Sequence, residues 1–347
     1  MKGKRILHIA SCDKFIPPFI DFVNKHFEPT KHEFMLTGGM SSGDLKNCVN
    51  VHLSGESKLL KLKYYFSLIL KMHQADQIIL HSLFNIKIVQ ILFFAPWLLK
   101  KCCWVIWGGD LYTYQFGKRN KKWQIDEFFR RPMIKRIGHL VTYIEGDIAL
   151  ARKWYGATGK YQECLMYTSN LYKEHKIPEN KEAIVNIQIG NSADPSNNHI
   201  EALEKLLPFK NENIRILVPL SYGSKEYAKQ VITQGKEWFG DKFKPLTEFM
   251  PFEQYLSLLG SIDIAIFNHK RQQAMGNTIT LLGLGKTVYL RSDTSQWQFF
   301  DGKNIKIGDI EMFNSLERYE TKENIKIVKE YFSQEKYKDQ LAKLFEL

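Results

Sequence analysis

The feature of the sequence that most restricts its fold is a repeated alternation of short apolar runs with longer helical patterns. In the first half, the predicted strands are 5–10, 32–38, 77–83, 103–108 and 139–144. The predicted helices between them include 19–27, 57–74 and 85–99. Short apolar runs bounded by polar turns indicate buried strands, and apolar residues every three or four positions indicate helices. This half is therefore expected to form a parallel sheet built from βαβ units.

The same alternation starts again after a polar stretch at 169–183, which we interpret as a linker. The predicted strands of the second half are 184–191, 213–223, 263–269 and 286–291. The predicted helices are 196–207, 225–240, 251–262 and 276–285, followed by one long helical pattern from about 324 to 345. We expect an α/β protein of two facing Rossmann-like domains with a central cleft. The domains are 1–175 and 184–320, with a C-terminal helix at 321–347 that can pack back on the N-terminal domain.

Positive charge is concentrated in the first half of the chain. Residues 1–180 hold 27 Lys and Arg against 15 Asp and Glu, whereas 181–347 hold 22 of each. A segregated excess favours a polyanionic partner, namely nucleic acid, anionic lipid or a phosphate-bearing acceptor, over a merely solvated Lys-rich surface. The densest cluster, interleaved with aromatic residues, suits an anionic membrane surface or an acceptor diphosphate, with RNA as an alternative. Its residues are Lys118, Arg119, Lys121, Lys122, Arg130 and Arg131.

Targeting and redox signals are weak. The apolar run after the N-terminus is too short for a signal peptide, and the apolar stretch 86–107 is divided by Pro96 and a Lys pair. We therefore expect neither a signal peptide nor a membrane-spanning helix. The five cysteines form no C-x-x-C pair, which favours free thiols in a reducing compartment.

Two strand ends of the second half carry residues suited to phosphate. Glycine allows close approach to a backbone, and a helix N-terminus attracts anions through its free amides and dipole. An N-capped turn is the plain alternative at each position. Two aromatic residues, Tyr222 and Phe249, could stack on a base, although core packing is the simpler interpretation of Phe249. The candidate residues for binding a nucleotide diphosphate are these two with Gly190, Asn191, Ser192, Arg271, Gln273, Gly276, Asn277 and Thr278.

Two aspartates follow strands of the first half. Asp13 lies in "SCDKF" and Asp110 in "WVIWGGDLY", where an apolar run ends at two glycines. A carboxylate at such a sheet edge could act as a general base toward an acceptor hydroxyl, or it could simply cap a turn. We take Asp110 as the first candidate and Asp13 as the second. No histidine spacing suits a metal, and no dinucleotide or P-loop glycine motif is present.

Four segments in combination resemble one family. They are "LHIASCDKF", "WVIWGGDLY", "IQIGNSADPSNNHIEAL" and "RQQAMGNTITLLGLGKTV", which cover most of the chain from about residue 6 to 300. They resemble the group 56 glycosyltransferases, often labelled 4-alpha-L-fucosyltransferase. The sequence departs from the family pattern at Gly109 and at Asn277–Thr278.

The resemblance implies a GT-B fold, a nucleotide-diphosphate sugar donor and a polyprenyl-diphosphate-linked saccharide acceptor at the inner membrane face. It also implies no metal or other cofactor. We therefore expect a peripheral glycosyltransferase, on the cytoplasmic side, that moves a (deoxyamino)sugar from a TDP- or UDP-activated donor in cell-surface glycan synthesis, without nucleic acid. The alternatives are a nucleotide-sugar epimerase of the same fold, which would need no acceptor, and a basic lipid- or RNA-binding protein, which would leave the phosphate loops idle.

Overall fold

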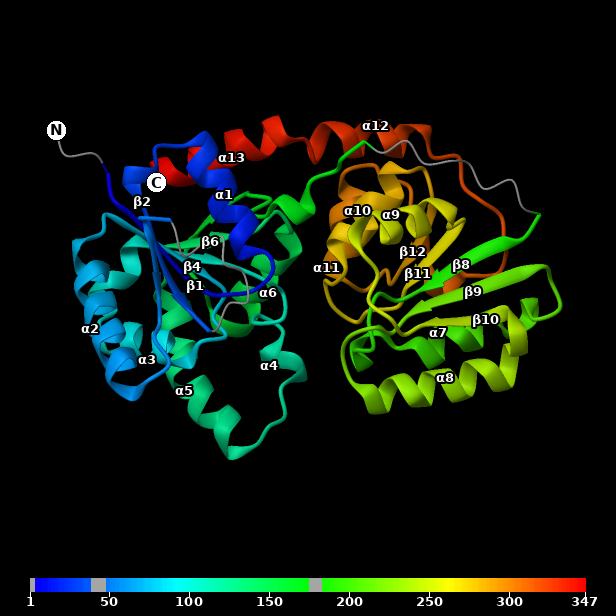
Figure 1. Cartoon of the computed structure of the whole chain (residues 1–347), viewed down its shortest axis with the longest axis horizontal. Helices are drawn as coiled ribbons and strands as arrows, with labels where there is room; N and C mark the ends of the chain where they lie inside the picture. Colours follow the sequence, from blue (N-terminus) through cyan, green and yellow to red (C-terminus); the bar gives the residue numbers. More distant parts are fainter. Residues whose placement is uncertain (1–3, 39–47, 175–182) are drawn as a thin grey trace. The chain divides into compact units, whose positions relative to one another are not determined.

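The computed structural model describes residues 4–38, 48–174 and 183–347. The chain divides into two compact units, each with its own sheet (Figure 1). Unit 1 comprises Met1–Ser169 together with Gln334–Leu347, and unit 2 comprises Asn170–Ser333. The segment 175–182, within the predicted linker, lies outside the described residues.

Unit 1 is built on a parallel sheet of seven strands in the order β3-β2-β1-β4-β5-β6-β7. Strand β1 lies between β2 and β4. Its residue Ile6 is opposite His32 of β2 on one side and opposite Gln77 of β4 on the other. Strands buried on both faces need continuous apolar runs, which is what β1 and β4 have. The strands are β1 (Ile6–Ser11), β2 (His32–Thr37), β3 (Val51–Leu53), β4 (Gln77–His81), β5 (Cys102–Val105), β6 (His139–Val141) and β7 (Lys160–Gln162).

Helices cover both faces of the unit 1 sheet (Figure 1). One face carries α1 (Ile16–His26) and the last helix, α13 (Gln334–Glu346). The other face carries α2 (Lys58–Gln74), α3 (Ile86–Phe94), α5 (Lys121–Arg136) and α6 (Glu145–Tyr155), which share one apolar cluster with the strands. The remaining elements are α4 (Thr113–Phe116) and the 3₁₀ segments η1 (Pro29–Lys31), η3 (Pro96–Lys101) and η4 (Thr168–Asn170).

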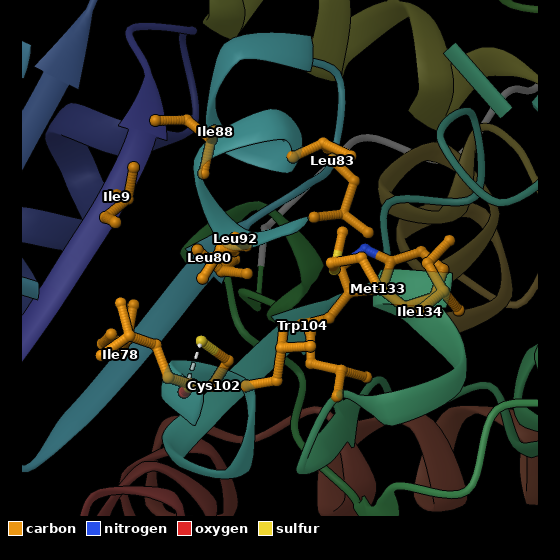
Figure 2. Close-up of a cluster of buried hydrophobic side chains, with 14 of the residues drawn as sticks. Ile9, Ile78, Leu80, Leu83, Ile88, Leu92, Cys102, Trp104, Met133 and Ile134 are labelled. Carbon is orange, nitrogen blue, oxygen red and sulfur yellow. Dashed lines mark hydrogen bonds between the residues drawn. The ribbon is translucent and has the colours of Figure 1, made fainter. Parts of the chain in front are cut away.

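The cluster beneath α3 and α5 shows how this face is closed (Figure 2). Trp104, from the inner strand β5 beside the central β4, is fully buried and lies near Leu83 and Met133. Cys102, two positions earlier on the same strand, points to the same side and donates its thiol hydrogen to the Leu98 carbonyl (3.3 Å). Burying a side chain as large as tryptophan contributes several kcal/mol, so β5 anchors the loop that follows it.

Unit 2 repeats the same strand order. Its six parallel strands run β10-β9-β8-β11-β12-β13, so the chain adds strands to one side of β8 and then, from β11 on, to its other side. In open α/β sheets, ligands bind outside the carboxyl ends of the strands at such a switch point. The strands are β8 (Val185–Ile189), β9 (Ile214–Pro219), β10 (Phe243–Leu246), β11 (Ile264–Phe267), β12 (Thr287–Leu290) and β13 (Gly308–Asp309).

The unit 2 helices also form two layers (Figure 1). Helices α7 (His199–Leu206) and α8 (Lys225–Phe239) pack on one face of the sheet. The others are α9 (Phe252–Ser261), α10 (Met275–Gly283), α11 (Ser295–Gly302) and α12 (Lys322–Tyr331). Short 3₁₀ segments are η5 (Pro195–Asn197), η6 (Leu207–Phe209), η7 (Gly240–Lys242) and η8 (Ile310–Met312).

The structure differs from the sequence expectation in three places. The single C-terminal helix expected at about 324–345 is two helices, α12 and α13, which end up in different units. The helix expected at 85–99 ends at Phe94, because Pro96 cannot continue it and disfavours a helical residue before it. Strands β3, β7 and β13 were not predicted, since each has only two or three residues.

Candidate functional site

The switch point of unit 2 lies where β8 and β11 end side by side. Gly190 directly follows β8, and its backbone N–H donates to the carbonyl of Ile266 on β11 (2.9 Å). Its φ of +65° favours glycine, and the space beside it is closed to any side chain. An added Cβ would lie 2.5 Å from His199 Nε2 and 2.6 Å from Asn197 Oδ1. The predicted residues Gly190, Asn191 and Ser192 therefore form a tight loop at the position where this fold binds ligands.

Asn197 holds this loop in place. Its Oδ1 accepts hydrogen bonds from the Asn191 backbone N–H (2.9 Å) and from His269 Nε2 (2.8 Å). Its Nδ2 donates to the Asp194 carbonyl (3.0 Å) and the Ser192 hydroxyl (3.3 Å). The side chain is fully buried, and a backbone N–H can only donate, so the orientation of the Asn197 amide is determined. One amide thus joins the loop after β8 to the loop after β11.

Two buried histidines beside Asn197 are neutral. Desolvation lowers the pKa of His199 to about 4 and, with a contribution from Arg271, that of His269 to about 3. His269 uses its Nε2 hydrogen on Asn197, so its Nδ1 is left as an acceptor. The Tyr227 hydroxyl accepts from the His199 backbone N–H (3.1 Å) and lies within hydrogen-bond distance of His199 Nδ1 (3.3 Å).

Three polar atoms of this strand end are buried without a hydrogen-bond partner among the described residues. They are Asn191 Oδ1, His199 Nε2 and His269 Nδ1. An unpaired buried polar group costs about 1–3 kcal/mol, so such groups mark places where another molecule completes the set. Asn191 Oδ1 and His269 Nδ1 are uncharged acceptors, so they match a ligand or water molecule that donates hydrogen bonds.

The N-terminus of α10 lies in the loop after β11. Ala274, which precedes the helix, has a φ of +57°, an uncommon and strained conformation for a residue with a side chain. Thr278 is fully buried, and its hydroxyl donates to the Ala274 carbonyl (3.1 Å) and accepts from Gln296 Nε2 (3.1 Å). Thr278 therefore fixes the helix start from inside. Gly276 and Asn277, in the first turn, remain partly exposed.

The other predicted donor residues lie around the same loops. Gln273 accepts a hydrogen bond at its Oε1 from the Ser196 hydroxyl (2.8 Å), which links the loop before α10 to the loop after β8. Arg271 is half-buried in the same loop. Tyr222 is about half-exposed (51%), and its hydroxyl accepts from Asn191 Nδ2 (3.1 Å). Phe249 is 85% exposed, so the alternative that it packs in the core is wrong.

Asp110 of unit 1 is buried in its own loop and not open to solvent. The side chain has no exposed surface. One oxygen, Oδ2, accepts from the Leu83 backbone N–H (2.9 Å) and Trp104 Nε1 (2.8 Å). The other accepts from the backbone N–H groups of Trp107 and Leu111 (3.0 Å each). All four donors are fixed, so this carboxylate holds the turn in which Gly108, with a φ of +76°, reverses the chain.

Burial decides the electrostatics of Asp110. Desolvation raises its pKa, against the hydrogen bonds from Trp104, Leu83 and Trp107 and the charge of the nearby Arg130. Arg130 itself is buried, and its guanidinium donates to the carbonyls of Asp110 (2.9 Å) and Leu83 (2.8 Å). The prediction that Arg130 belongs to an exposed basic surface is therefore wrong, because this arginine braces the Asp110 loop from inside.

A chain of buried histidines crosses the unit 1 sheet. His81 at the end of β4 contacts His8 of β1 (Nε2 to Nδ1, 3.1 Å), and His8 contacts His32 of β2 (Nε2 to Nδ1, 3.0 Å). The Tyr167 hydroxyl accepts from Trp107 Nε1 (2.8 Å) and lies 2.7 Å from His81 Nδ1. The Trp107 indole N–H can only donate, so the Tyr167 oxygen accepts from it. If each hydrogen is paired with one acceptor, the Tyr167 O–H donates to His81 Nδ1, His81 Nε2–H donates to His8 Nδ1, and His8 Nε2–H donates to His32 Nδ1.

The remaining unit 1 candidates are exposed. Asp13 lies in the turn before α1, and its side chain accepts only a long hydrogen bond from the Phe15 backbone N–H (3.4 Å). In the predicted basic cluster, the guanidinium of Arg119 lies over the Trp123 ring (4.1 Å), and Arg131 pairs with Glu127 (3.2 Å). The other exposed members of the cluster are Lys118, Lys121 and Lys122.

Comparison with known protein families shows which family the chain belongs to. The family described as 4-alpha-L-fucosyltransferase, glycosyl transferase group 56, matches residues 17–339. The chain belongs to glycosyltransferase group 56. The family predicted from the four sequence segments is thereby confirmed, and this group 56 chain is a sugar-transferring enzyme of the hexosyltransferase type.

Solved structures confirm the fold of the group 56 chain. Anabaena HepE in complex with UDP-glucose superposes with a TM-score of 0.69 at 12% identity, over 99% of this chain and 100% of that one. Sucrose-phosphate synthase from Thermosynechococcus elongatus gives 0.67 at 10%, over 99% and 98%. A glycosyltransferase from Rickettsia africae gives 0.66 at 12%, over 100% and 98%. Like these glycosyltransferases, the chain has the GT-B fold of two parallel-sheet α/β domains.

Three residues of the unit 2 site in this group 56 enzyme were not among the candidates predicted from the sequence. Asn197, His199 and His269 were passed over, although "SNNH" follows the glycine loop and "FNH" ends a strand. Their signal was a run of polar residues in the loops after β8 and β11, which is also typical of an ordinary turn. Within 4–38, 48–174 and 183–347, no helix is long and apolar enough to cross a membrane.

Proposed function

We propose that this enzyme transfers a (deoxyamino)sugar from a TDP- or UDP-activated donor to a polyprenyl-diphosphate-linked saccharide, in cell-surface glycan synthesis. The observation that carries the proposal is the unit 2 switch point, where the Gly190 loop and the start of α10 share one hydrogen-bond network. In this fold, nucleotides bind at that edge of the sheet. The similar HepE structure in complex with UDP-glucose gives independent support for a nucleotide-sugar donor.

In this proposal, the donor diphosphate lies against the Gly190–Ser192 loop and the first turn of α10. Gly190 permits the left-handed turn that places Asn191 and Ser192 at this edge of the sheet, and the α10 dipole and free amides favour negative charge. Arg271 supplies a guanidinium that can pair with two phosphate oxygens. These groups would stabilise the leaving nucleotide diphosphate as its negative charge grows, which is why we propose that the reaction needs no metal. Tyr222 and Phe249 offer exposed rings on which a base could stack.

On the acceptor side, we propose different roles for the two aspartates. Asp13 is exposed and only weakly bonded, so it can take or orient the proton of an acceptor hydroxyl. Asp110 is a positioning residue, because its carboxylate is occupied by four N–H donors and acts through the loop that it holds. This reverses the order of the sequence-based candidates. A peripheral position at the cytoplasmic face of the inner membrane follows from the lipid-linked acceptor.

The decisive experiment is a thermal-shift screen of UDP, TDP and their sugars against the whole chain. A ligand present at about a hundred times its Kd stabilises a protein by about 2.7 kcal/mol, which is an easily measured shift. Arg271→Gln should weaken nucleotide binding about tenfold, which corresponds to about 1.4 kcal/mol. The exposed Lys244 of β10 provides the matched control, because Lys244→Gln removes a charge from the same unit away from the loops. No stabilisation by any nucleotide would contradict the proposal.

The epimerase alternative is separated by the product. An epimerase converts its nucleotide sugar without an acceptor, whereas transfer releases nucleotide diphosphate only when a prenyl-diphosphate saccharide is added. Release of the diphosphate should therefore depend on the acceptor. Asp13→Asn should lower that release at least tenfold while leaving the thermal shift by nucleotide unchanged.

A further inference from the structure

Helix α2 carries two opposite apolar faces, of which only one is buried. Tyr64, Leu68 and Met72, spaced by four, pack into the core of unit 1. On the other side, large apolar side chains recur every three or four positions and face solvent: Leu59 (62% exposed), Leu62 (68%), Phe66 (65%), Ile69 (37%) and Leu70 (48%). A helix on the surface of a soluble domain normally presents polar residues there, so the outward face of α2 needs a partner.

The charges within α2, α3 and η3 are all positive. Lys58 and Lys63 lie on either side of the outward stripe when the helix is projected at 3.6 residues per turn. The sequences of α2, α3 and η3 contain no Asp or Glu. An apolar stripe flanked by lysines is the pattern of a helix that lies in the plane of an anionic bilayer surface, with its lysines at the headgroups. A surface that binds another protein normally has a rim of mixed polar and charged residues around its apolar centre, and no acidic residue of α2, α3 or η3 provides one here.

The exposed apolar surface continues beyond α2. Trp97 of η3 is 64% exposed, and its indole N–H donates to His73 at the end of α2 (3.2 Å). Phe94 of α3 is 70% exposed, and its neighbour Phe93 contacts Phe128 of α5, which is 64% exposed (ring centroids 5.6 Å apart). Figure 1 shows α2, α3 and α5 on one side of the unit 1 sheet. Tryptophan at the rim of such a band suits the membrane interface.

Unit 1 holds most of the exposed apolar side chains of the protein. Among the described residues, 14 of the 17 large hydrophobic side chains that are exposed lie in unit 1, and three lie in unit 2. The basic segment at 118–131 is less suited to insertion, because Arg130 is buried and Arg131 pairs with Glu127. The band is therefore a better candidate for lipid contact than the cluster that the sequence indicated.

We infer that the outward face of α2, with Trp97 and Phe94, is the surface by which unit 1 inserts into an anionic lipid bilayer. The inference deepens the proposed function, on which it rests for its purpose, by naming the element that brings unit 1 to a lipid-linked acceptor. The helix lies along the interface, with the outward leucines and Phe66 below the headgroups and the lysines among them.

The test is co-sedimentation of the full chain with vesicles of phosphatidylcholine alone and of phosphatidylcholine mixed with phosphatidylglycerol. Binding to the anionic vesicles should be at least tenfold stronger, should weaken with salt and should shift the tryptophan emission to shorter wavelength. The double variant Leu62→Gln/Phe66→Gln should lose at least tenfold in binding, because both side chains are exposed and leave the core intact. Trp97→Phe should abolish most of the emission shift.

Met312→Gln is the control, since it removes an exposed apolar side chain (72%) from unit 2 and should bind vesicles like the unaltered protein. Equal vesicle binding by the Leu62/Phe66 variant would overturn the inference. So would a concentration-dependent dimer that this variant loses, without vesicle binding by the original protein, because the face would then be an interface between copies. Vesicle binding is measured without substrates, and the nucleotide shift without vesicles, so either proposal can fail alone.

Discussion

The carboxyl ends of the two sheets carry similar residues, but their hydrogen bonds are completed differently. In unit 1, both oxygens of Asp110 are occupied by N–H donors, and the rings of His8 and His81 are linked into a continuous chain. In unit 2, His199 and His269 each keep a buried ring nitrogen without a partner. Among its described residues, unit 1 also contains unpaired buried atoms, such as Arg130 Nε, but the Asp110 carboxylate and the His8–His81 pair have their partners, whereas the atoms around Asn197 in unit 2 do not.

The difference shows why a buried polar residue is not by itself a sign of chemistry. A satisfied network stabilises one arrangement of its loops, whereas unfilled donors and acceptors are costly until something binds. Asp110 was the more prominent candidate in the sequence, yet its four partners make it structural. Asn197 was unremarked, yet it organises the loops at the switch point.

Lowering the pH should have the largest effect, and it should strike unit 1 harder. Burial lowers the pKa most strongly for His8, His32 and His81 in unit 1 and for His199 and His269 in unit 2, whereas unfolded histidines take up protons below about pH 6.5. Their stabilising contribution is complete above that pH and is lost as the pH falls toward the folded pKa values, which are about 4 for His32 and His199 and about 3 for His81 and His269. Each histidine changes the free energy of unfolding by at most about 1.4 kcal/mol per pH unit. The largest slope is therefore about 4 kcal/mol per pH unit for unit 1 and about 3 kcal/mol per pH unit for unit 2.

The measurement is urea unfolding from about pH 7 to about pH 5, followed by tryptophan emission, since five of the seven tryptophans lie in unit 1 and only Trp238 and Trp297 in unit 2. The raised pKa values of Asp110 and Glu127 act in the opposite sense and reduce the slope. A free energy of unfolding that stays level over this range would contradict the neutral, buried histidine chain.

Asp110→Asn should cost about 3 kcal/mol of unit 1 stability. The amide nitrogen would face N–H donors where an oxygen now accepts, leaving about two buried donors unsatisfied. Chemical unfolding measures the loss, and Asp13→Asn provides the control, because the exposed Asp13 should change stability by less than about 0.5 kcal/mol. If the Asp110 variant keeps full stability and loses only turnover, Asp110 takes part in the reaction directly.

Gly190→Ala tests the loop of unit 2 that contains the unpaired buried atoms. Its methyl group would overlap His199 Nε2 and Asn197 Oδ1, at a φ that disfavours alanine, so we expect a cost of about 2 kcal/mol and loss of the nucleotide thermal shift. Gly156→Ala is the control, since it has the same φ of +65° but no atom within 4 Å of an added Cβ. If the two variants behave alike, backbone strain and not the crowded loop accounts for the effect.

Much of this architecture was predictable because its strands are buried on both faces. Continuous apolar runs such as "QIILH" and "IAIF" have few other uses in a soluble chain, so their positions and the parallel order followed. The split of the last helical pattern was not predictable, because α12 and α13 both have helical spacing and the break at Phe332–Ser333 depends on which unit each packs against.

Residue roles were harder to predict than elements. "WGGDLY" was recognisable as a strand end, but the sequence could not show that Leu83, 27 positions earlier, would occupy the Asp110 carboxylate. Likewise, α2 was readable as a helix, but its two apolar faces only become different once Tyr64 and Leu68 are found in the core and Phe66 outside it. Long-range partners decide whether a polar or apolar residue is a structural or a functional one.

The smallest expected effect comes from Tyr222→Phe, and it probes how the unfilled loop is held. The tyrosine hydroxyl accepts from Asn191 Nδ2 at 3.1 Å, on a residue that is half-exposed, so its loss should change global stability by less than about 0.5 kcal/mol. The aromatic ring remains, so stacking on a base is preserved. Binding should weaken about threefold to tenfold, because Asn191 loses the bond that orients its unpaired Oδ1.

Isothermal titration with UDP at matched ionic strength measures this difference, and Tyr222→Leu separates the ring from the hydroxyl. If the bond to Asn191 is what matters, the Phe and Leu variants should share the threefold to tenfold loss, and the Leu variant should lose more only where the ring also stacks. Unchanged affinity in the Phe variant would mean that Asn197 alone orders the loop. The contrast with unit 1 would then lie entirely in the atoms around Asn197, because its Oδ1 already accepts from both Asn191 and His269.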